Sequence, residues 1–185
     1  MTGALFPVSV FIFLSGLLLF AWRMKKVQDE RDEANWDDLI QKLVPLSKVG
    51  IEEVACSFLA PSGRELDPRR REDRLESRDI WDFIGGIEGL KAMRRNAAVL
   101  IDLACYVQRW NSEAFVVAEQ LRLDASEIRA ALAKIRFARW RGDLGSKFPI
   151  HAARAAAAYY LMTQRLCALY EISQTGLLLR LKAAI

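Results

Sequence analysis

Histidine is almost absent from this sequence of 185 residues, and its scarcity excludes most familiar catalytic machinery. His151 is the single imidazole, so a Ser/His/Asp or Cys/His arrangement has only this residue to build on. It falls in the first turn of an expected helix, where the helix dipole disfavours the charged imidazole. We therefore assign His151 a surface or packing role, name no catalytic residue and expect a protein that is not an enzyme.

Cysteine is also scarce, with three residues far apart in the chain: Cys56, Cys105 and Cys167. An odd number of cysteines within apolar helical stretches excludes a disulfide framework and indicates small core residues that stay reduced. The chain also lacks Cys-x-x-Cys, His-Glu-x-x-His and Glu-x-x-His spacings, which would cluster metal ligands. We expect no metal site and no cofactor.

Alternation of polar and apolar residues, which marks a half-buried strand, is missing as well. No segment combines such alternation with an excess of β-branched side chains. Apolar residues recur instead at helical spacing, as Leu90, Met93, Ala97 and Leu100 do. The sequence therefore predicts an all-α fold.

Charged residues are absent from the first 22 residues, of which 16 are hydrophobic. As a helix, Leu5 to Trp22 would cover about 27 Å, close to the hydrocarbon thickness of a bilayer. A cleaved signal peptide is the alternative, but a basic start and small residues before a cleavage site are both missing. We expect residues 1–22 to form a single, uncleaved transmembrane anchor.

Basic residues flank this segment on one side only, at Arg23, Lys25, Lys26 and Arg31. The positive-inside rule then places the N-terminus outside and the remainder of the chain in the cytoplasm. Reduced cysteines agree with that compartment. The expected location is the plasma (inner) membrane, with a cytoplasmic C-terminal domain.

The remaining sequence divides into two parts. Residues 23–79 are expected to form a charged stem, short helices and a mixed-charge linker, in which six arginines from residue 64 onward are balanced by six acids. Residues 80–185 are expected to form a small helical bundle, and basic residues outnumber acids by ten to three after residue 126. Its expected elements are a helix over 80–84 capped by Asp79, helices over 87–110, 112–122, 125–141 and 150–172, and a loop over 142–149.

A capping box is the best local signal in the bundle. Asp124 and Glu127 have the N-cap and N3 spacing, and Leu123 and Ile128 stand where a hydrophobic staple forms. This pattern predicts a helix that starts at Ala125 and is ended by a glycine at position 142.

The stretch from Val117 to Leu132, with its regular apolar positions and a helix start at Asp124, resembles the helix-turn-helix signature of bacterial DNA-binding domains. It departs from that pattern at Arg122, where the motif usually has glycine. The resemblance implies a membrane-anchored DNA-binding regulator built on residues 117–141. Two acids at the DNA-facing end would oppose phosphate, so nucleic acid is a disfavoured partner. The residues facing the groove or the phosphates would be Ser126, Glu127, Arg129, Ala130, Lys134, Arg136 and Arg139.

A basic and aromatic surface is predicted on the outer side of the same helix. Ile128, Leu132 and Ile135 share the face expected to enter the core, which leaves Phe137 and Trp140 on the other side among arginines. Beside a bilayer, such a surface can rest on anionic lipid headgroups. The alternative is that both rings pack under the following loop. The predicted surface comprises Arg129, Arg136, Phe137, Arg139, Trp140 and Arg141.

Asp102 is the one carboxylate inside an apolar helical run, VLIDLACY. A buried carboxylate needs a partner, and the alanine-rich last helix offers Arg154 or Arg165. We predict a structural ion pair rather than a general acid or base, because the sequence indicates no second titrating group beside it.

These features favour a membrane-tethered helical interaction or scaffold protein with no identifiable catalytic site. Its expected partners are the membrane and a protein, which is either a different protein or a second copy of the chain. The membrane-anchored DNA-binding regulator ranks second, and an enzyme of an unfamiliar type ranks third.

Overall fold

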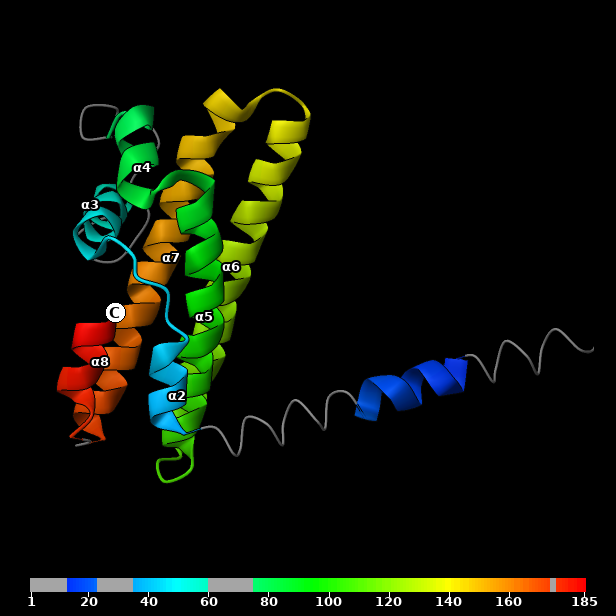
Figure 1. Ribbon diagram of the computed structural model, residues 1–185, viewed down its shortest axis with the longest axis vertical. Coiled ribbons are helices and arrows are strands. Elements are labelled where there is room, and N and C mark those ends of the chain that lie inside the picture. The colour runs from blue at the N-terminus through cyan, green and yellow to red at the C-terminus, as the bar shows by residue number, and fades with distance from the viewer. Residues whose placement is uncertain (1–12, 23–34, 60–74, 174–175) are drawn as a thin grey trace, which may run out of the picture. The chain divides into compact units, whose positions relative to one another are not determined.

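Figure 1 shows a computed structural model of the chain, which describes residues 13–22, 35–59, 75–173 and 176–185. Helices, turns and short connections make up these residues, and no strand occurs among them. The predicted all-α class is therefore confirmed. The chain forms two units, Met1–Asn35 and Trp36–Ile185.

The first unit contains a helix over residues 13–22, and its large apolar side chains are exposed. Phe13, Leu18 and Trp22, for example, are 67%, 73% and 63% exposed. Within the described part of the chain, no helix has both the length and the apolar character needed to cross a bilayer. The rest of the predicted anchor, residues 1–12, lies outside the described residues.

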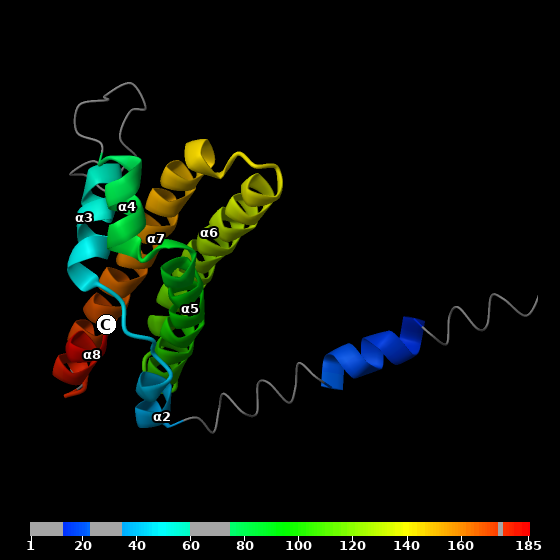
Figure 2. The same ribbon diagram turned by 45° about the horizontal axis from the view of Figure 1, so that its top comes forward.

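The second unit is built around three long helices that lie side by side: α5 (Gly86–Gln108), α6 (Ala114–Trp140) and α7 (Leu144–Ile172). Figures 1 and 2 show that successive helices run in opposite directions and connect at alternate ends of the bundle. The predicted helical bundle is confirmed. The shorter helices described in this unit are α2 (Trp36–Gln41), α3 (Lys48–Phe58), α4 (Ser77–Ile84) and α8 (Leu178–Ala184).

The central helix is α7, which contacts α3, α4, α5, α6 and α8. Its middle is rich in alanine, and Ala152, Ala155 and Ala156 are completely buried. The distance between packed helix axes depends on the side chains at the crossing, so small residues let several helices approach closely. The alanine-rich sequence of α7 thus allows several helices to pack around it.

Glycines permit the close contacts around α4. The chain turns from α4 into α5 at Gly85, whose φ of +76° lies in the left-handed region that favours glycine. Gly50 of α3 lies so near α4 that a Cβ atom would be only 2.6 Å from the Phe83 carbonyl oxygen. Any larger residue at position 50 would push these two helices apart.

Buried hydrogen bonds tie α2 to the bundle. The indole Nε1 of Trp36 donates to the Tyr170 hydroxyl at 3.0 Å, and that hydroxyl donates to the Leu103 carbonyl at 3.1 Å. Both Trp36 and Tyr170 are buried. Each polar atom in this chain of contacts therefore has a partner, as burial requires.

A second buried tie is made by Asn96 of α5, which is 2% exposed. Its amide oxygen accepts from the Val44 N–H and its amide nitrogen donates to the Val44 carbonyl, both at 2.8 Å. The same nitrogen donates to the Tyr159 hydroxyl at 3.2 Å. Because residues 36–44 are held by α5 and α7, the compact unit starts at Trp36 instead of at residue 80.

Helix α6 is continuous where two helices were expected. It passes through residues 122–124 without a break, so the predicted capping box and the helix start at Ala125 are wrong. The Asp124 carboxylate pairs with Arg165 of α7 instead of capping a backbone N–H. Leu123 is 62% exposed, so it does not form the predicted staple.

This continuity also overturns the helix-turn-helix arrangement predicted for residues 117–141. That motif needs a turn between its two helices so that the second can enter the major groove. Residues 122–124 contain neither glycine nor proline, and packing on α5 and α7 keeps them helical.

Two other helix starts differ from expectation. Helix α7 begins at Leu144, so most of the predicted 142–149 loop is helical, and Pro149 lies near the helix start, where its missing N–H removes a single hydrogen bond. Helix α4 begins at Ser77, which places Asp79 in its first turn and not at its N-cap.

The cysteines are not core residues as predicted. Cys56 is exposed, and Cys105 and Cys167 are half-buried. Each cysteine lies in a helix with a buried apolar face, but at a position next to that face and not on it. Cys56, for example, follows the buried Ala55 by one position and so points about 100° away from it.

Candidate functional site

Helix α6 has two apolar faces. The inner face, with Leu121, Ile128 and Ile135 at intervals of seven, is buried against α5 and α7. A helix at the edge of a bundle usually has one such face and a polar side opposite it. On α6 the opposite side carries a second set of apolar residues, and these face solvent.

We call this second set the outer stripe. Its bulky members are between 55% and 82% exposed. Positions seven apart return to nearly the same side of a helix after two turns, so the side chains form one strip along much of the helix. The outer stripe consists of Val116, Leu123, Ala130, Ala133, Phe137 and Trp140. Glu119 and Ser126 lie on the same side in its N-terminal half, so the stripe is most apolar from residue 130 onward.

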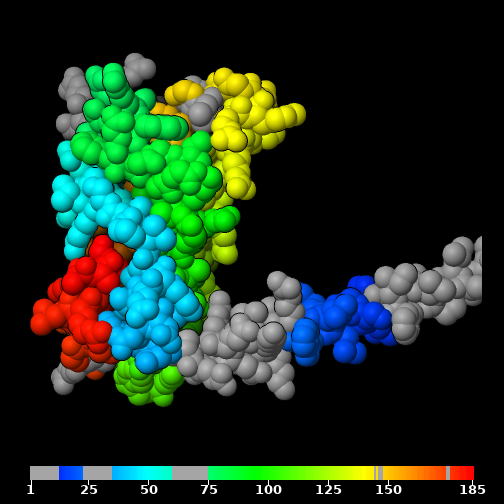
Figure 3. Space-filling view, in the orientation of Figure 1, coloured from blue at the N-terminus to red at the C-terminus, as the bar shows by residue number. Residues whose placement is uncertain are grey.

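Two aromatic rings mark the C-terminal end of the stripe. The ring centroids of Phe137 and Trp140 are 5.9 Å apart, and the Arg141 guanidinium carbon lies 5.6 Å from the centre of the Phe137 ring. The rings are 55% and 82% exposed. The alternative in which the following loop covers both rings is therefore wrong. Figure 3 shows this end of α6, in yellow, at the surface of the bundle.

Cations border the stripe on both sides. Arg122, Arg129 and Arg136 recur every seven residues along one border and are named the arginine row. Lys134 and Arg141 lie on the other border, which Glu127 begins. Apolar side chains edged by cations thus run along the solvent side of α6.

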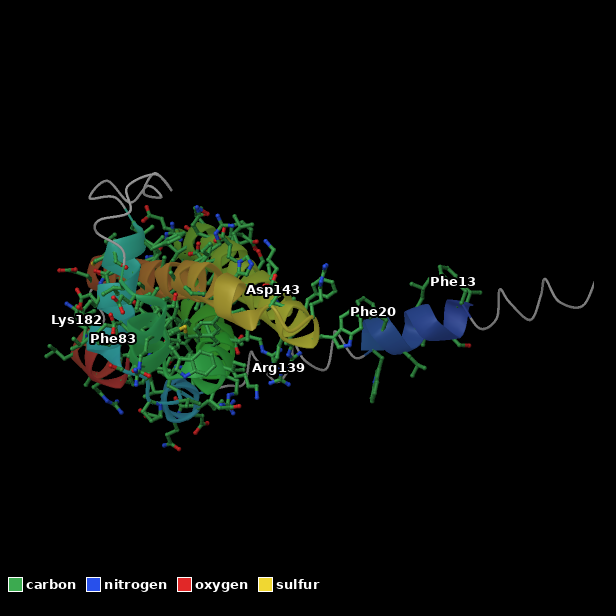
Figure 4. All side chains as sticks on the ribbon, turned by 90° about the horizontal axis from the view of Figure 1, so that it is seen from above. Phe13, Phe20, Phe83, Arg139, Asp143 and Lys182 are labelled. Carbon is green, nitrogen blue, oxygen red and sulfur yellow. The ribbon has the colours of Figure 1, made fainter. Side chains whose placement is uncertain are left out.

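The structure brings five of the six predicted surface residues together on or beside the stripe and separates Arg139 from them. Arg139 follows the buried Ile135 by four residues, so it lies on the same side of α6 as the inner face and not on the side of the stripe. It is exposed at the α6–α7 end of the bundle, as is Asp143 (Figure 4).

Charge changes sign along α6. Between residues 128 and 142 there are five basic residues and no acid, and none of the five forms an ion pair within the described part of the chain. Further toward the N-terminus, Glu119 pairs with Arg122, and Asp124 pairs with Arg165. Those two acids are neutralised internally and Glu127 is exposed, whereas residues 128–142 present a positive field to solvent.

One of the two arginines predicted to pair with Asp102 has another partner. Arg165 of α7 pairs with Asp124 of α6. Asp102 and Arg154 are half-buried, and Oδ1 of the former and Nε of the latter are shielded from solvent. A pairing of Asp102 with Arg154 stays a prediction.

A polar cavity of about 120 Å³, which sequence reasoning missed, lies between α3 and α7. Its lining includes Lys48, Glu52, Tyr160 and Cys167. Burial raises the pKa of the Tyr160 hydroxyl, and the nearby Glu52 raises it further. Burial also raises the pKa of the Cys167 thiol, so both groups keep their protons at neutral pH and neither is an activated nucleophile.

The cavity residues are far apart in the chain, and no sequence spacing indicates that they meet. Among the described residues, no three His, Cys, Asp or Glu side chains are placed to hold a metal ion. Comparison with known protein families, with curated proteins and with solved structures finds no match for this chain.

Proposed function

We propose that this protein is a membrane-anchored, non-enzymatic interaction module that binds its partner through the outer stripe of α6. The exposed second apolar face of α6 carries the proposal. Contiguous apolar patches rimmed by polar residues mark interaction sites on soluble domains. Tryptophan and arginine, both present at the end of the stripe, are among the residue types most enriched at binding hot spots.

The N-terminal segment supports the membrane anchor. Its first 22 residues carry no charged side chain, and the large apolar side chains of residues 13–22 are exposed. Basic residues follow it directly, from Arg23 to Arg31. The proposed topology is a single pass through the plasma (inner) membrane, with the N-terminus outside and Trp36–Ile185 in the cytoplasm.

The anchor is tested by introducing charge into the full-length protein. We expect Leu17→Arg with Leu18→Arg to release the protein from membranes into an alkaline carbonate wash, because two buried cations are costly in hydrocarbon. Val49→Arg, at an exposed apolar position of α3, should leave the protein in the pellet. Release of the wild-type protein by carbonate would contradict the proposed membrane anchor.

The orientation is tested with the exposed Cys56 thiol. A membrane-impermeant maleimide should label intact cells weakly and permeabilised cells strongly, and Cys56→Ser should remove most of the labelling. Strong labelling of intact cells would show that Cys56 lies outside the cell and would contradict the proposed topology.

The binding surface is tested with a photo-crosslinking amino acid in the full-length protein within its own membranes. Position 133 lies in the outer stripe, and position 49 is also exposed but lies on α3. We expect a discrete adduct from position 133 and none from position 49. Equal adducts from both positions, or none from either, would contradict the proposal.

A further inference from the structure

The outer stripe has the spacing of a surface that accepts a helix. Val116, Leu123, Ala130 and Phe137 recur every seven residues, and Trp140 follows three positions after the last. Because an α-helix has about 3.6 residues per turn, a partner helix that follows such a repeat crosses at about 20°, as in left-handed coiled coils. A flat partner such as a lipid surface would not require this register.

The sizes of the side chains also suit a helix. Ala130 and Ala133 lie in the middle of the stripe, and the bulky Phe137 and Trp140 project at its end. Small residues leave holes for the larger side chains of a neighbouring helix and allow the two axes to come close. Alanine offers little apolar area for insertion into a bilayer, so positions 130 and 133 favour a helix over lipid.

The cations then decide which helix fits. In a parallel pair of α6 helices, Arg129 would face Lys134 of a second copy and Arg136 would face Arg141, whereas Arg122 would face Glu127. In an antiparallel pair, the arginine row would face its own copy. Contacts between like charges outnumber those between opposite charges in the parallel pair, and the arginines repel in the antiparallel pair, so the charges disfavour self-association.

We propose that the outer stripe of α6 binds an amphipathic α-helix of another protein, with an apolar seven-residue repeat flanked by Asp and Glu. Along the C-terminal half of the stripe, acidic flanks would meet Arg129 and Arg136 on one side and Lys134 and Arg141 on the other. This inference rests on the proposed function and names the class of partner that the same surface recognises.

The test uses two labelled synthetic peptides of about four heptads. Both carry the same Leu/Ala seam, and their flanking positions are all Glu in one peptide and all Lys in the other. Full-length protein in detergent micelles is titrated against each, and binding is followed by fluorescence anisotropy. We expect the Glu peptide to bind at least about tenfold more tightly than the Lys peptide, with the difference shrinking at high salt.

Charge reversal locates the contact. Arg129→Glu with Arg136→Glu should weaken binding of the Glu peptide by about tenfold or more and improve binding of the Lys peptide. The matched control is Arg94→Glu with Arg95→Glu, two exposed arginines of α5, which should leave both affinities unchanged. Circular dichroism confirms that each variant is folded. Equal binding of the two peptides, or equal loss in both variants, would overturn the proposal.

Enlarging the alanines separates a helix from lipid by the sign of the effect. Ala130→Leu with Ala133→Leu fills the holes in the stripe, so binding of the Glu peptide should fall about tenfold. The same change adds apolar surface and would strengthen binding to phosphatidylserine vesicles. Tighter vesicle binding together with unchanged peptide binding would assign the surface to lipid and overturn the proposed helix partner.

The two proposals fail in different ways. If position 133 gives an adduct in membranes but the Glu peptide does not bind, the surface is used and the partner class is wrong. If neither occurs, the proposed function fails as well. Adducts to a second copy of the chain would likewise overturn the acidic-helix partner.

Discussion

Trp36 and Trp140 are the same residue type at opposite ends of the bundle, and each has an arginine nearby. Trp36 is 2% exposed, its indole nitrogen donates to Tyr170, and the Arg180 guanidinium carbon lies 4.8 Å from the centre of its ring. Trp140 is 82% exposed and contacts the ring of Phe137. The first has a complete set of partners within the chain, whereas the second leaves its apolar surface in water.

The difference separates residues that hold the fold from residues that are available to a partner. Burying a large ring contributes stability only when its polar atom is also satisfied, as at Trp36. A tryptophan left exposed beside a second ring and several cations contributes little to folding. The exposure of Trp140 therefore indicates that the outer stripe is available for binding.

The largest expected effect is at the buried ring. Trp36→Ala should lower the free energy of unfolding by about 3–5 kcal/mol, because it leaves a cavity and removes the donor to Tyr170. Trp140→Ala should change it by less than about 0.5 kcal/mol. Urea unfolding in a mild detergent measures both. Comparable losses would mean that Trp140 belongs to the core.

The second largest effect should come from Asn96, whose side chain satisfies both backbone groups of Val44. Asn96→Ala removes the side-chain partners of this part-buried N–H and carbonyl and the buried donor to the Tyr159 hydroxyl, and it should cost about 2–3 kcal/mol. Asn111→Ala removes a part-buried hydrogen bond to Ser173 and should cost about 1 kcal/mol or less. If the two variants melted at the same temperature, Val44 would not depend on Asn96.

Within α6, the two acid–arginine pairs should differ in the same direction. Asp124→Asn breaks the part-buried pair with Arg165, where the side chains are 16% and 33% exposed, and should cost about 1–2 kcal/mol. Glu119→Gln removes an exposed pair with Arg122 and should cost less than about 0.5 kcal/mol. The stabilities are compared by thermal melting at low and high salt. A larger loss for Glu119→Gln would reverse the assignment of the internal charge pair.

The smallest effect appears only in alkali. Burial raises the pKa of the Tyr170 hydroxyl above its ordinary value of 10.0. Its stabilising contribution is thus fully present below pH 10 and is lost as the pH rises above 10, by at most about 1.4 kcal/mol per pH unit. Between pH 9 and 11 the melting temperature of wild type should fall more than that of Tyr170→Phe. Parallel pH profiles would show that Tyr170 titrates as if exposed.

Helical periodicity predicted the long helices well, since the spacing of apolar residues along α5 and α7 matches the faces that are buried. Local capping signals were less reliable. Asp124 and Glu127 have ideal capping-box spacing, yet Arg165, 41 positions away, takes the Asp124 carboxylate and the helix continues. A local signal worth about 1 kcal/mol is outweighed when an unbroken helix can pack along its full length.

The candidate site shows the same division. The outward direction of Phe137 and Trp140 follows from their helical phase relative to Ile128 and Ile135, and it was predicted. The extension of the stripe back to Val116 was not, because a break at residues 122–124 would have interrupted it. The partners of Trp36 and Asn96 also had no local signature, since each lies more than 50 residues from a group it contacts.

Residue order alone is enough to specify an all-α chain, an uncharged apolar N-terminal segment and a basic, aromatic face on one helix, because helical phase and charge are local properties. Tertiary packing decides that α6 is unbroken, that Arg165 serves Asp124 and that residues 36–44 belong to the bundle. Each of these outcomes depends on which distant groups meet, and burial of those groups outweighs the local preference of the segment.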